Sequence, residues 1–367
     1  MTHVFVAPHP DDVALSCGGL IAGLRELGQN VTIVTVFSGA GRVGDDGENG
    51  SLTRYQREAL GFGTKTIWPV TEAFNRSHIS ADYPVYGDPD LLPAWAATDD
   101  RLEATQADAD AAAKRFWQRS SWYRRASIRA ESLAGQPVMD ALSTQGAVAT
   151  DELVDAAAAG ELMARRRLED EAFAAFAEAS IVFLDLPDAV FRGYTDDEQL
   201  LNAPRDDDAA PYEILRNEVA RLEPQKLYLP LGIGNHVDHQ LCREVGVRLL
   251  TESRRWVMPG PEYAGIVTFY EDFPYAWWND FRQLGDLPPT AFAALPAEVG
   301  LMPEYADIGD QLERKITGIN LYASQIDRLF IGGTQEMARQ VRAYARRIAL
   351  LNGSSGVAER YWSAIAS

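Results

Sequence analysis

Three of the five histidines in this 367-residue chain lie in two short clusters that also contain aspartates. The first cluster runs from Pro8 to Asp12 (PHPDD) and the second from His236 to His239 (HVDH). Imidazole nitrogens and carboxylate oxygens bind zinc, and a catalytic zinc site combines three such protein ligands with one position left to water. Two histidines and one carboxylate meet that requirement, and a second carboxylate can accept a proton from the water. The residue types therefore favour metal-assisted hydrolysis.

Either cluster, taken alone, also has a purely structural explanation. Proline and aspartate are typical turn residues, and Asp12 or Asp238 would serve as the N-cap of a helix. The metal site is favoured because each cluster follows a predicted strand, His3 to Ala7 or Lys226 to Pro230. Ligands of an open parallel sheet bind at the carboxyl ends of its strands. We therefore expect both clusters at one edge of the sheet, although more than 220 residues separate them.

The predicted strands and helices alternate as in an α/β fold. Two strands, His3 to Ala7 and Val31 to Phe37, flank a helix at Leu20 to Leu27. The run VTIVTVF is typical of a strand buried on both faces of a parallel sheet. The alternation resumes after residue 160, with helices at Glu161 to Ala177, Pro211 to Leu222 and His239 to Thr251, and strands at Ile181 to Leu186, Lys226 to Pro230 and Ile266 to Tyr270. We expect a Rossmann-like three-layer α/β fold with a mostly parallel sheet.

Two segments are expected to add to this single domain of residues 1–367. Residues 70–160 break the alternation, and we expect them to form a largely helical insertion. At the other end, within residues 310–352, the sequence predicts two amphipathic helices, Asp310 to Leu329 and Thr334 to Asn352, joined by a Gly-Gly turn.

The composition argues against several classes of protein. The formal net charge is −19 at pH 7 and the sequence pI about 4.7, so phosphate backbones and anionic membrane surfaces would be repelled. Two cysteines cannot form a disulfide framework in so long a chain, and no apolar run approaches the roughly 18 residues that span a bilayer. We therefore expect a cytoplasmic protein that binds neither nucleic acid nor membrane, while a homo-oligomer stays open.

The segment Ala7 to Ala22 (APHPDDVALSCGGLIA) resembles the opening of the LmbE-like (PIG-L) N-deacetylases. In that family a first strand is followed by His-Pro-Asp-Asp-Glu, by small residues and by a Gly-Gly helix start. His236 to His239 resembles the family's second signature, His-x-Asp-His. Weaker similarities occur at Arg166-x-x-Glu169, Leu184 to Asp188 and Lys315 to Gln325, so the resemblance covers residues 1–40 and 161–352.

The resemblance implies a zinc-dependent hydrolase that removes an N-acyl group, usually N-acetyl, from a small-molecule amino sugar or sugar conjugate. The implied roles are as follows: His9, Asp12 and His239 bind zinc, Asp11 is the general base, His236 stabilises the oxyanion or protonates the departing amine, and Asp238 orients a histidine. A site of two histidines and one carboxylate also accepts iron, cobalt or nickel, so other divalent metals stay open. Arg166 has two interpretations, a helix pair with Glu169 or a contact with a substrate hydroxyl or phosphate.

One departure from the family pattern bears on the substrate. Val13 stands where the family has glutamate, which affects the expected substrate more than the chemistry. A first alternative is an amidase acting on a larger thiol–sugar or natural-product conjugate.

A second alternative belongs to a different class, a non-catalytic carbohydrate- or nucleotide-binding protein. Gly39 to Gly44 (GAGRVG) matches the dinucleotide-binding fingerprint. However, the acidic segment DDGENG follows it where a helix should begin, so we expect a loop beside the active site instead.

Overall fold

The computed structural model of the chain describes residues 1–40, 56, 147–208, 210–251, 265–278, 299–330 and 332–366. Nearly all of them belong to one compact unit formed by Met1–Gln56 and Asp151–Ser367. Most of the insertion predicted at 70–160 lies outside the described residues, as does most of the glycine-rich segment 39–44, so both expectations stay predictions.

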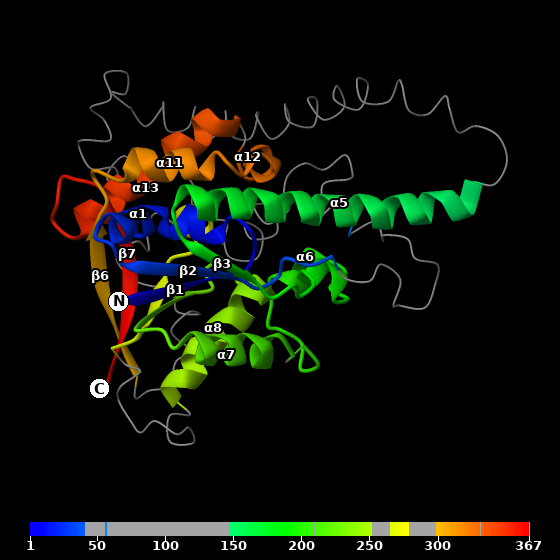
Figure 1. The fold of residues 1–367 in the computed structure, drawn as a ribbon, viewed down its shortest axis with the longest axis horizontal. Helices are drawn as coiled ribbons and strands as arrows, with labels where there is room; N and C mark the ends of the chain where they lie inside the picture. The colour runs from blue at the N-terminus through cyan, green and yellow to red at the C-terminus, as the bar shows by residue number, and fades with distance from the viewer. Residues whose placement is uncertain are drawn as a thin grey trace, which may run out of the picture. The chain divides into compact units, whose positions relative to one another are not determined.

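A seven-stranded sheet forms the centre of this unit, in the order β3-β2-β1-β4-β5-β7-β6 (Figure 1). Its strands are β1 (Thr2–Ala7), β2 (Asn30–Thr35), β3 (Ser180–Phe183), β4 (Lys226–Pro230), β5 (Val267–Tyr270), β6 (Val299–Asp307) and β7 (Ala358–Ala366). The first five strands in this order pair in parallel, whereas β7 runs antiparallel to both β5 and β6. The expected mostly parallel sheet is confirmed.

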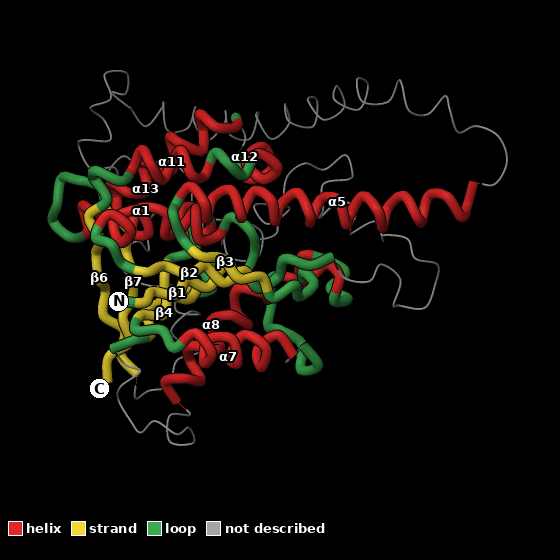
Figure 2. Tube along the Cα trace, in the orientation of Figure 1, coloured by secondary structure: helices red, strands yellow, loops and turns green. Residues whose placement is uncertain are grey.

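Helices cover both faces of the sheet (Figures 1 and 2). One face carries α1 (Asp12–Glu26), α5 (Ala147–Phe176), α11 (Leu312–Ile319), α12 (Ala323–Leu329) and α13 (Gly333–Leu351), and the other carries α7 (Ala210–Leu222) and α8 (Val237–Thr251). The remaining described helices are short: η3 (Ala189–Phe191), α6 (Asp197–Leu200) and α9 (Tyr275–Trp278). This is the three-layer α/β arrangement that the sequence predicted. Within the described residues, none of the helices is long and apolar enough to cross a membrane.

The core lies along the central strands. Val4, Phe5 and Val6 of β1 are fully buried, and Leu229 of β4 is buried to the same extent. Strands covered on both faces contain continuous apolar runs rather than alternating ones, which is why their positions were predicted to within one or two residues.

Helix α1 begins at Asp12, eight residues before the predicted start at Leu20. Every residue from Asp12 to Gly19 is buried, so the first two turns lack the polar face that predicts an amphipathic helix. Small residues are needed there, because a Cβ on Gly19 would lie 2.7 Å from the Ile308 side chain. The sequence pattern therefore did not show where the helix begins, because its first residues are all buried.

The predicted helix Asp310 to Leu329 is in fact two helices, α11 and α12, separated by three residues. The break lies at Tyr322, whose φ of −89° and ψ of 56° are not helical. Two bonds to α5 hold this break, from the Tyr322 hydroxyl to Asp170 at 2.6 Å and from the Ser324 backbone to Glu169 at 2.9 Å. A local sequence pattern contains no information about such long-range partners. The antiparallel strands β6 and β7 were missed for the same reason.

Candidate metal centre

The two histidine clusters meet where the strand order reverses. Strands β1 and β4 are parallel neighbours, with β2 beyond one and β5 beyond the other, and ligands of doubly wound sheets bind at such a switch point. The first cluster leads from β1 into α1, and the second lies at the start of α8 after β4. The ring centre of His9 is 4.9 Å from that of His236 and 5.4 Å from that of His239. The structure therefore brings together the clusters that lie far apart in sequence.

A tight glycine loop carries the second cluster into place. Gly232 and Gly234 both have positive φ, 80° and 94°. A Cβ on Gly234 would lie 2.7 Å from the ring of Tyr275. These positions require glycine, and the turn that they make delivers His236 and His239 to the crevice.

Two of the three predicted ligands, His9 and His239, lie beside a carboxylate oxygen of the third, Asp12. Asp12 Oδ2 lies 3.3 Å from His9 Nδ1 and 3.4 Å from His239 Nε2. The same oxygen accepts the backbone N–H of His9 at 2.8 Å, which holds it in place. His239 is 1% exposed, and its Nε2 is buried without a hydrogen-bond partner among the described residues. An imidazole nitrogen left bare beside a carboxylate is suited to a cation, so these residues fit a metal.

A buried carboxylate lies behind each of the two histidines. His9 Nε2 lies 2.9 Å from Asp238 Oδ2, and His239 Nδ1 lies 2.6 Å from Asp272 Oδ1. When each of these nitrogens donates its proton to the carboxylate, the other nitrogen, on the Asp12 side, keeps its lone pair. Metal-binding histidines usually have such a partner, which fixes the tautomer and the ring orientation.

Asp272 was not predicted from the sequence, although a signal for it existed. It lies two residues after the last residue of β5, which is the parallel neighbour of β4. Its second oxygen accepts the backbone N–H of Ile233 at 2.9 Å, so both oxygens are engaged. The rule that polar residues after adjacent parallel strands meet at one edge would have identified it.

The metal-ligand groups that are close in space differ from the predicted set of His9, Asp12 and His239. Among the described residues, ligand atoms lie within 4.8 Å of one another in two groups: His9 with His236 and His239, and His9 with Asp188 and Asp238. Asp238 is less suited to binding a metal, because Arg192 donates to its Oδ1 at 2.5 Å. Its Oδ2 is engaged by His9 and by the backbone N–H of Ala189.

The local charges favour a cation between the histidines. Burial alone would lower the pKa of His9, but hydrogen bonds with Asp12 and Asp238 raise that pKa well above its usual value. Burial, together with the charge of His9, lowers the pKa of His236 well below its usual value. Burial would raise the pKa of Asp238, but the charge of Arg192 and the bond with His9 hold it well below its usual range. His236 is therefore the neutral histidine of the cluster.

Asp11 has a strained backbone, with φ of 104° and ψ of −33°. It occupies the N-cap position of α1, yet its side chain makes no capping bond. Its backbone N–H bonds to the carboxylate of Asp170, which also accepts the hydroxyls of Thr35 at 2.5 Å and Tyr322 at 2.6 Å. Burial and the neighbouring charge of Asp12 raise the pKa of the Asp11 carboxyl well above its usual value. Such strain is typical of functional sites.

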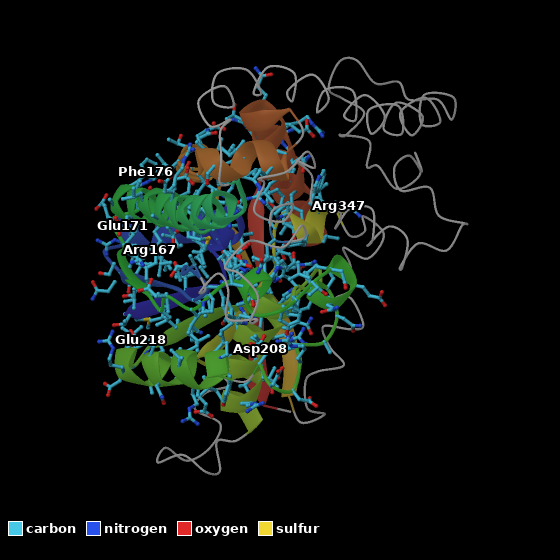
Figure 3. All side chains as sticks on the ribbon, turned by 90° about the vertical axis from the view of Figure 1, so that its right-hand side faces the viewer. Arg167, Glu171, Phe176, Asp208, Glu218 and Arg347 are labelled. Carbon is cyan, nitrogen blue, oxygen red and sulfur yellow. The ribbon has the colours of Figure 1, made fainter. Side chains whose placement is uncertain are left out.

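Arg166 lies on the buried side of α5, and its charge acts on the carboxylates of Asp11 and Asp188. Among the hydrogen bonds and ion pairs of the described residues, its expected helix partner Glu169 is engaged by Ser324 and Arg165. The next residue, Arg167, which Figure 3 labels, pairs with Asp185 and lies over the ring of Phe183 at the end of β3. The charge of Glu169 also acts on Arg166, so both interpretations of this residue stay predictions.

With this geometry established, we compared the chain with known proteins. Residues 4–67 match the model of the PIG-L family, described as GlcNAc-PI de-N-acetylase. The predicted resemblance to the LmbE-like (PIG-L) family is confirmed. The matched segment contains the first of the two PIG-L-like clusters and the start of α1.

One curated relative that the chain matches is 2'-N-acetylparomamine deacetylase from Streptomyces fradiae. It is 31% identical over 179 residues, which are 48% of this chain and 55% of the relative. The chain therefore spans about half the length of the curated relative that it matches.

Two solved deacetylases have the same fold as this chain. A deacetylase of the teicoplanin biosynthetic pathway superposes with a TM-score of 0.54 at 16% identity, covering 100% of this chain and 99% of that one. The pseudoaglycone deacetylase Dbv21 gives a TM-score of 0.51 at 19% identity, covering 99% and 97%. At such low identity these likenesses establish the α/β fold and nothing further.

Proposed function

We propose that this protein is a zinc-dependent deacetylase that hydrolyses an N-acyl group, most simply N-acetyl, on an amino sugar or sugar conjugate. The observation that carries the proposal is the pair of histidines backed by Asp238 and Asp272, with their other nitrogens beside Asp12. The curated relative is named for deacetylation of an N-acetylated amino sugar, which supports the same reaction class.

In this proposal the metal is held by His9 Nδ1, Asp12 Oδ2 and His239 Nε2. A zinc ion bound there would act as a Lewis acid and lower the pKa of a coordinated water. The bare, buried Nε2 of His239 is the structural support for this set. The set of three histidines is the rival, and Asp12→Asn distinguishes the two, because only the first set loses a ligand.

We assign Asp11 as the general base. A carboxylate with a raised pKa is a stronger base than an ordinary one, and burial together with Asp12 raises the pKa of Asp11. Asp11 would take the proton of the attacking water and, once protonated, could pass it to the departing amine. The strained backbone held by Asp170 keeps this carboxyl beside the ligands.

We assign His236 to the oxyanion rather than to the amine. Its Nδ1 accepts the backbone N–H of Asp238 at 3.2 Å, so the proton of the neutral ring is on Nε2. Because the pKa of His236 is lowered, the ring stays neutral and donates a hydrogen bond instead of transferring a proton. This choice resolves the two roles left open for His236 by the sequence.

The proposed substrate is a small N-acetylated amino sugar, and Arg166 would contact one of its hydroxyls or an anionic group. The test is a panel of substrates: N-acetylglucosamine, 2'-N-acetylparomamine, longer N-acyl analogues and a thiol–sugar conjugate. We expect zinc-loaded protein to release acetate from at least one of the N-acetyl compounds. Release only from the thiol–sugar conjugate would favour the amidase alternative. Binding of these sugars without release of any carboxylate would support the non-catalytic alternative.

The role of Asp11 is tested with Asp11→Asn, which keeps the shape of the side chain and removes the base. We expect kcat to fall by about 10² to 10⁴-fold while zinc content is unchanged. Asp310→Asn is the control, because Asp310 is an exposed aspartate before α11. An Asp11→Asn protein with the turnover of the wild type would exclude the assigned base.

A further inference from the structure

Arg192, just after η3, connects two buried aspartates. Its Nη2 donates to Asp238 Oδ1 at 2.5 Å and to Asp208 Oδ2 at 2.8 Å, and its Nε donates to Asp208 Oδ1 at 2.8 Å. The third nitrogen, Nη1, donates to the backbone carbonyl of Pro187 at 2.7 Å. All three nitrogens of the guanidinium are therefore engaged, and its side chain is only 9% exposed.

The guanidinium of Arg192 also packs against an aromatic ring. Its carbon lies 4.5 Å from the ring centre of Phe37, within the range of a cation–π contact. Asp208, labelled in Figure 3, also accepts the hydroxyl of Tyr194 at 3.0 Å. Arg192 thus has little freedom to move, and Asp208 contributes to holding it.

Arg192 affects the orientation of Asp238, whose two carboxylate oxygens have different partners. Arg192 holds Oδ1, and Oδ2 therefore faces His9 Nε2 at 2.9 Å. Asp238 is fully buried, and among the described residues Arg192 is the arginine that pairs with it. Without Arg192, the Asp238 carboxylate would lose this partner and could rotate away from His9.

We propose that Arg192, held by Asp208, is a positioning residue of the metal centre, which aims Asp238 at His9 and thereby aims His9 Nδ1 at the metal. The inference rests on the metal set of the proposed function. Neither Arg192 nor Asp208 belongs to the two histidine clusters, so the loop of residues 187–208 becomes a third part of the site.

The direct test is the zinc dissociation constant of the full chain, measured by competition with a chelator. Arg192→Gln should weaken zinc binding by about 10 to 100-fold, as is usual when the partner of a metal ligand is disturbed. Arg192→Lys should lose less zinc affinity than Arg192→Gln, because lysine keeps the positive charge. It should still bind more weakly than the wild type, because lysine lacks the planar set of donors.

Arg205→Gln is the matched control. Arg205 is an exposed arginine of the same loop that donates to the backbone carbonyls of Gly193 and Arg192 but not to Asp238. We expect its zinc affinity to stay within about two-fold of the wild type, since the partners of the metal ligands are untouched. A loss as large as that of Arg192→Gln would show that general disturbance of the loop explains the effect, and would overturn the proposal.

A double-mutant cycle shows whether Arg192 acts through Asp238. In an Asp238→Asn background, Arg192→Gln should cause no further loss of zinc affinity. An equal loss in both backgrounds, or none in the wild-type background, overturns the proposal. Should Arg192→Gln fail to fold, Asp208→Asn replaces it. We expect Asp208→Asn to lose less zinc affinity than Arg192→Gln, and an unchanged zinc affinity would contradict the proposal. A wild type that binds no zinc contradicts the proposed function itself, whereas zinc binding that is insensitive to Arg192 contradicts this inference alone.

Discussion

Glu271 and Asp272 are neighbours after β5, but they serve opposite halves of the sheet. Glu271 faces the antiparallel half, where it accepts from Arg360 Nε at 2.7 Å and Trp362 Nε1 at 3.0 Å, and also from the hydroxyl of Tyr344. Asp272 faces the parallel half and holds His239. Both carboxylates are buried, so burial alone does not distinguish a structural charge from a functional one.

Two buried sites, one in each half, differ in how completely their polar atoms are satisfied. In the antiparallel half, Lys315 Nζ lies 2.6 Å from Glu359 Oε1, and Glu359 also accepts two backbone N–H groups and the Tyr361 hydroxyl. At the edge of the parallel half, His239 Nε2 has no hydrogen-bond partner in the part of the chain that the structure describes. A buried charge that is paired within the protein destabilises the fold when its partner is removed, whereas a polar atom left bare is able to bind a ligand.

The largest expected effect is on stability, from breaking a satisfied pair. Lys315→Met leaves Glu359 buried without its cation and should lower the free energy of unfolding by about 3 to 5 kcal/mol, measured by urea denaturation. The zinc affinity of the folded protein should stay nearly unchanged. Lys315→Met combined with Glu359→Gln should recover part of the loss, because no charge is then left unpaired. A selective loss of zinc binding without loss of stability would contradict the division between the halves.

A smaller effect is expected on the pH dependence of stability, through the titration of Asp170. Burial raises the pKa of Asp170 from 3.8 to about 6, despite the hydroxyl bonds from Thr35 and Tyr322 that lower it. A carboxyl whose pKa is higher in the folded state contributes stability that is complete below pH 3.8 and is lost as pH rises through 6. The contribution lost over this interval is about 3 kcal/mol.

Asp170→Asn removes this titration. Between pH 4 and pH 7 the free energy of unfolding should fall by about 3 kcal/mol more in the wild type than in the variant, measured by denaturation at each pH without metal. Parallel pH curves for the two proteins would refute the raised pKa of Asp170.

The smallest expected effect is on zinc affinity, and it tests whether Asp272 supports the metal site while its neighbour Glu271 does not. Asp272→Asn keeps an oxygen for His239 but removes the charge, and should weaken zinc binding by about 10 to 100-fold, measured by chelator competition. Asp307→Asn, on an exposed residue of β6, is the control and should leave zinc affinity unchanged. Equal affinities for Asp272→Asn and the wild type would remove Asp272 from the metal centre.

The sequence predicted those parts of the molecule that depend on local pattern. The buried strands β1, β2 and β4 were found from their apolar runs, and the two histidine clusters from their places after such strands. Asp272, Arg192 and Asp170 were missed, because the contacts that bring each of them to the candidate site involve partners far away in the sequence. The break between α11 and α12 and the pairing of β6 with β7 also depend on distant partners.

The central claim is that two clusters more than 220 residues apart form one metal site. The most direct measurement is elemental analysis of the wild type, His239→Ala and His3→Gln, purified side by side and reconstituted with zinc. His3 is the control, since it bonds to Tyr228 on the sheet and lies outside the clusters. We predict about one zinc per chain in the wild type and in His3→Gln, and its loss in His239→Ala. A wild type without metal, or a His239→Ala protein that keeps it, would contradict the claim.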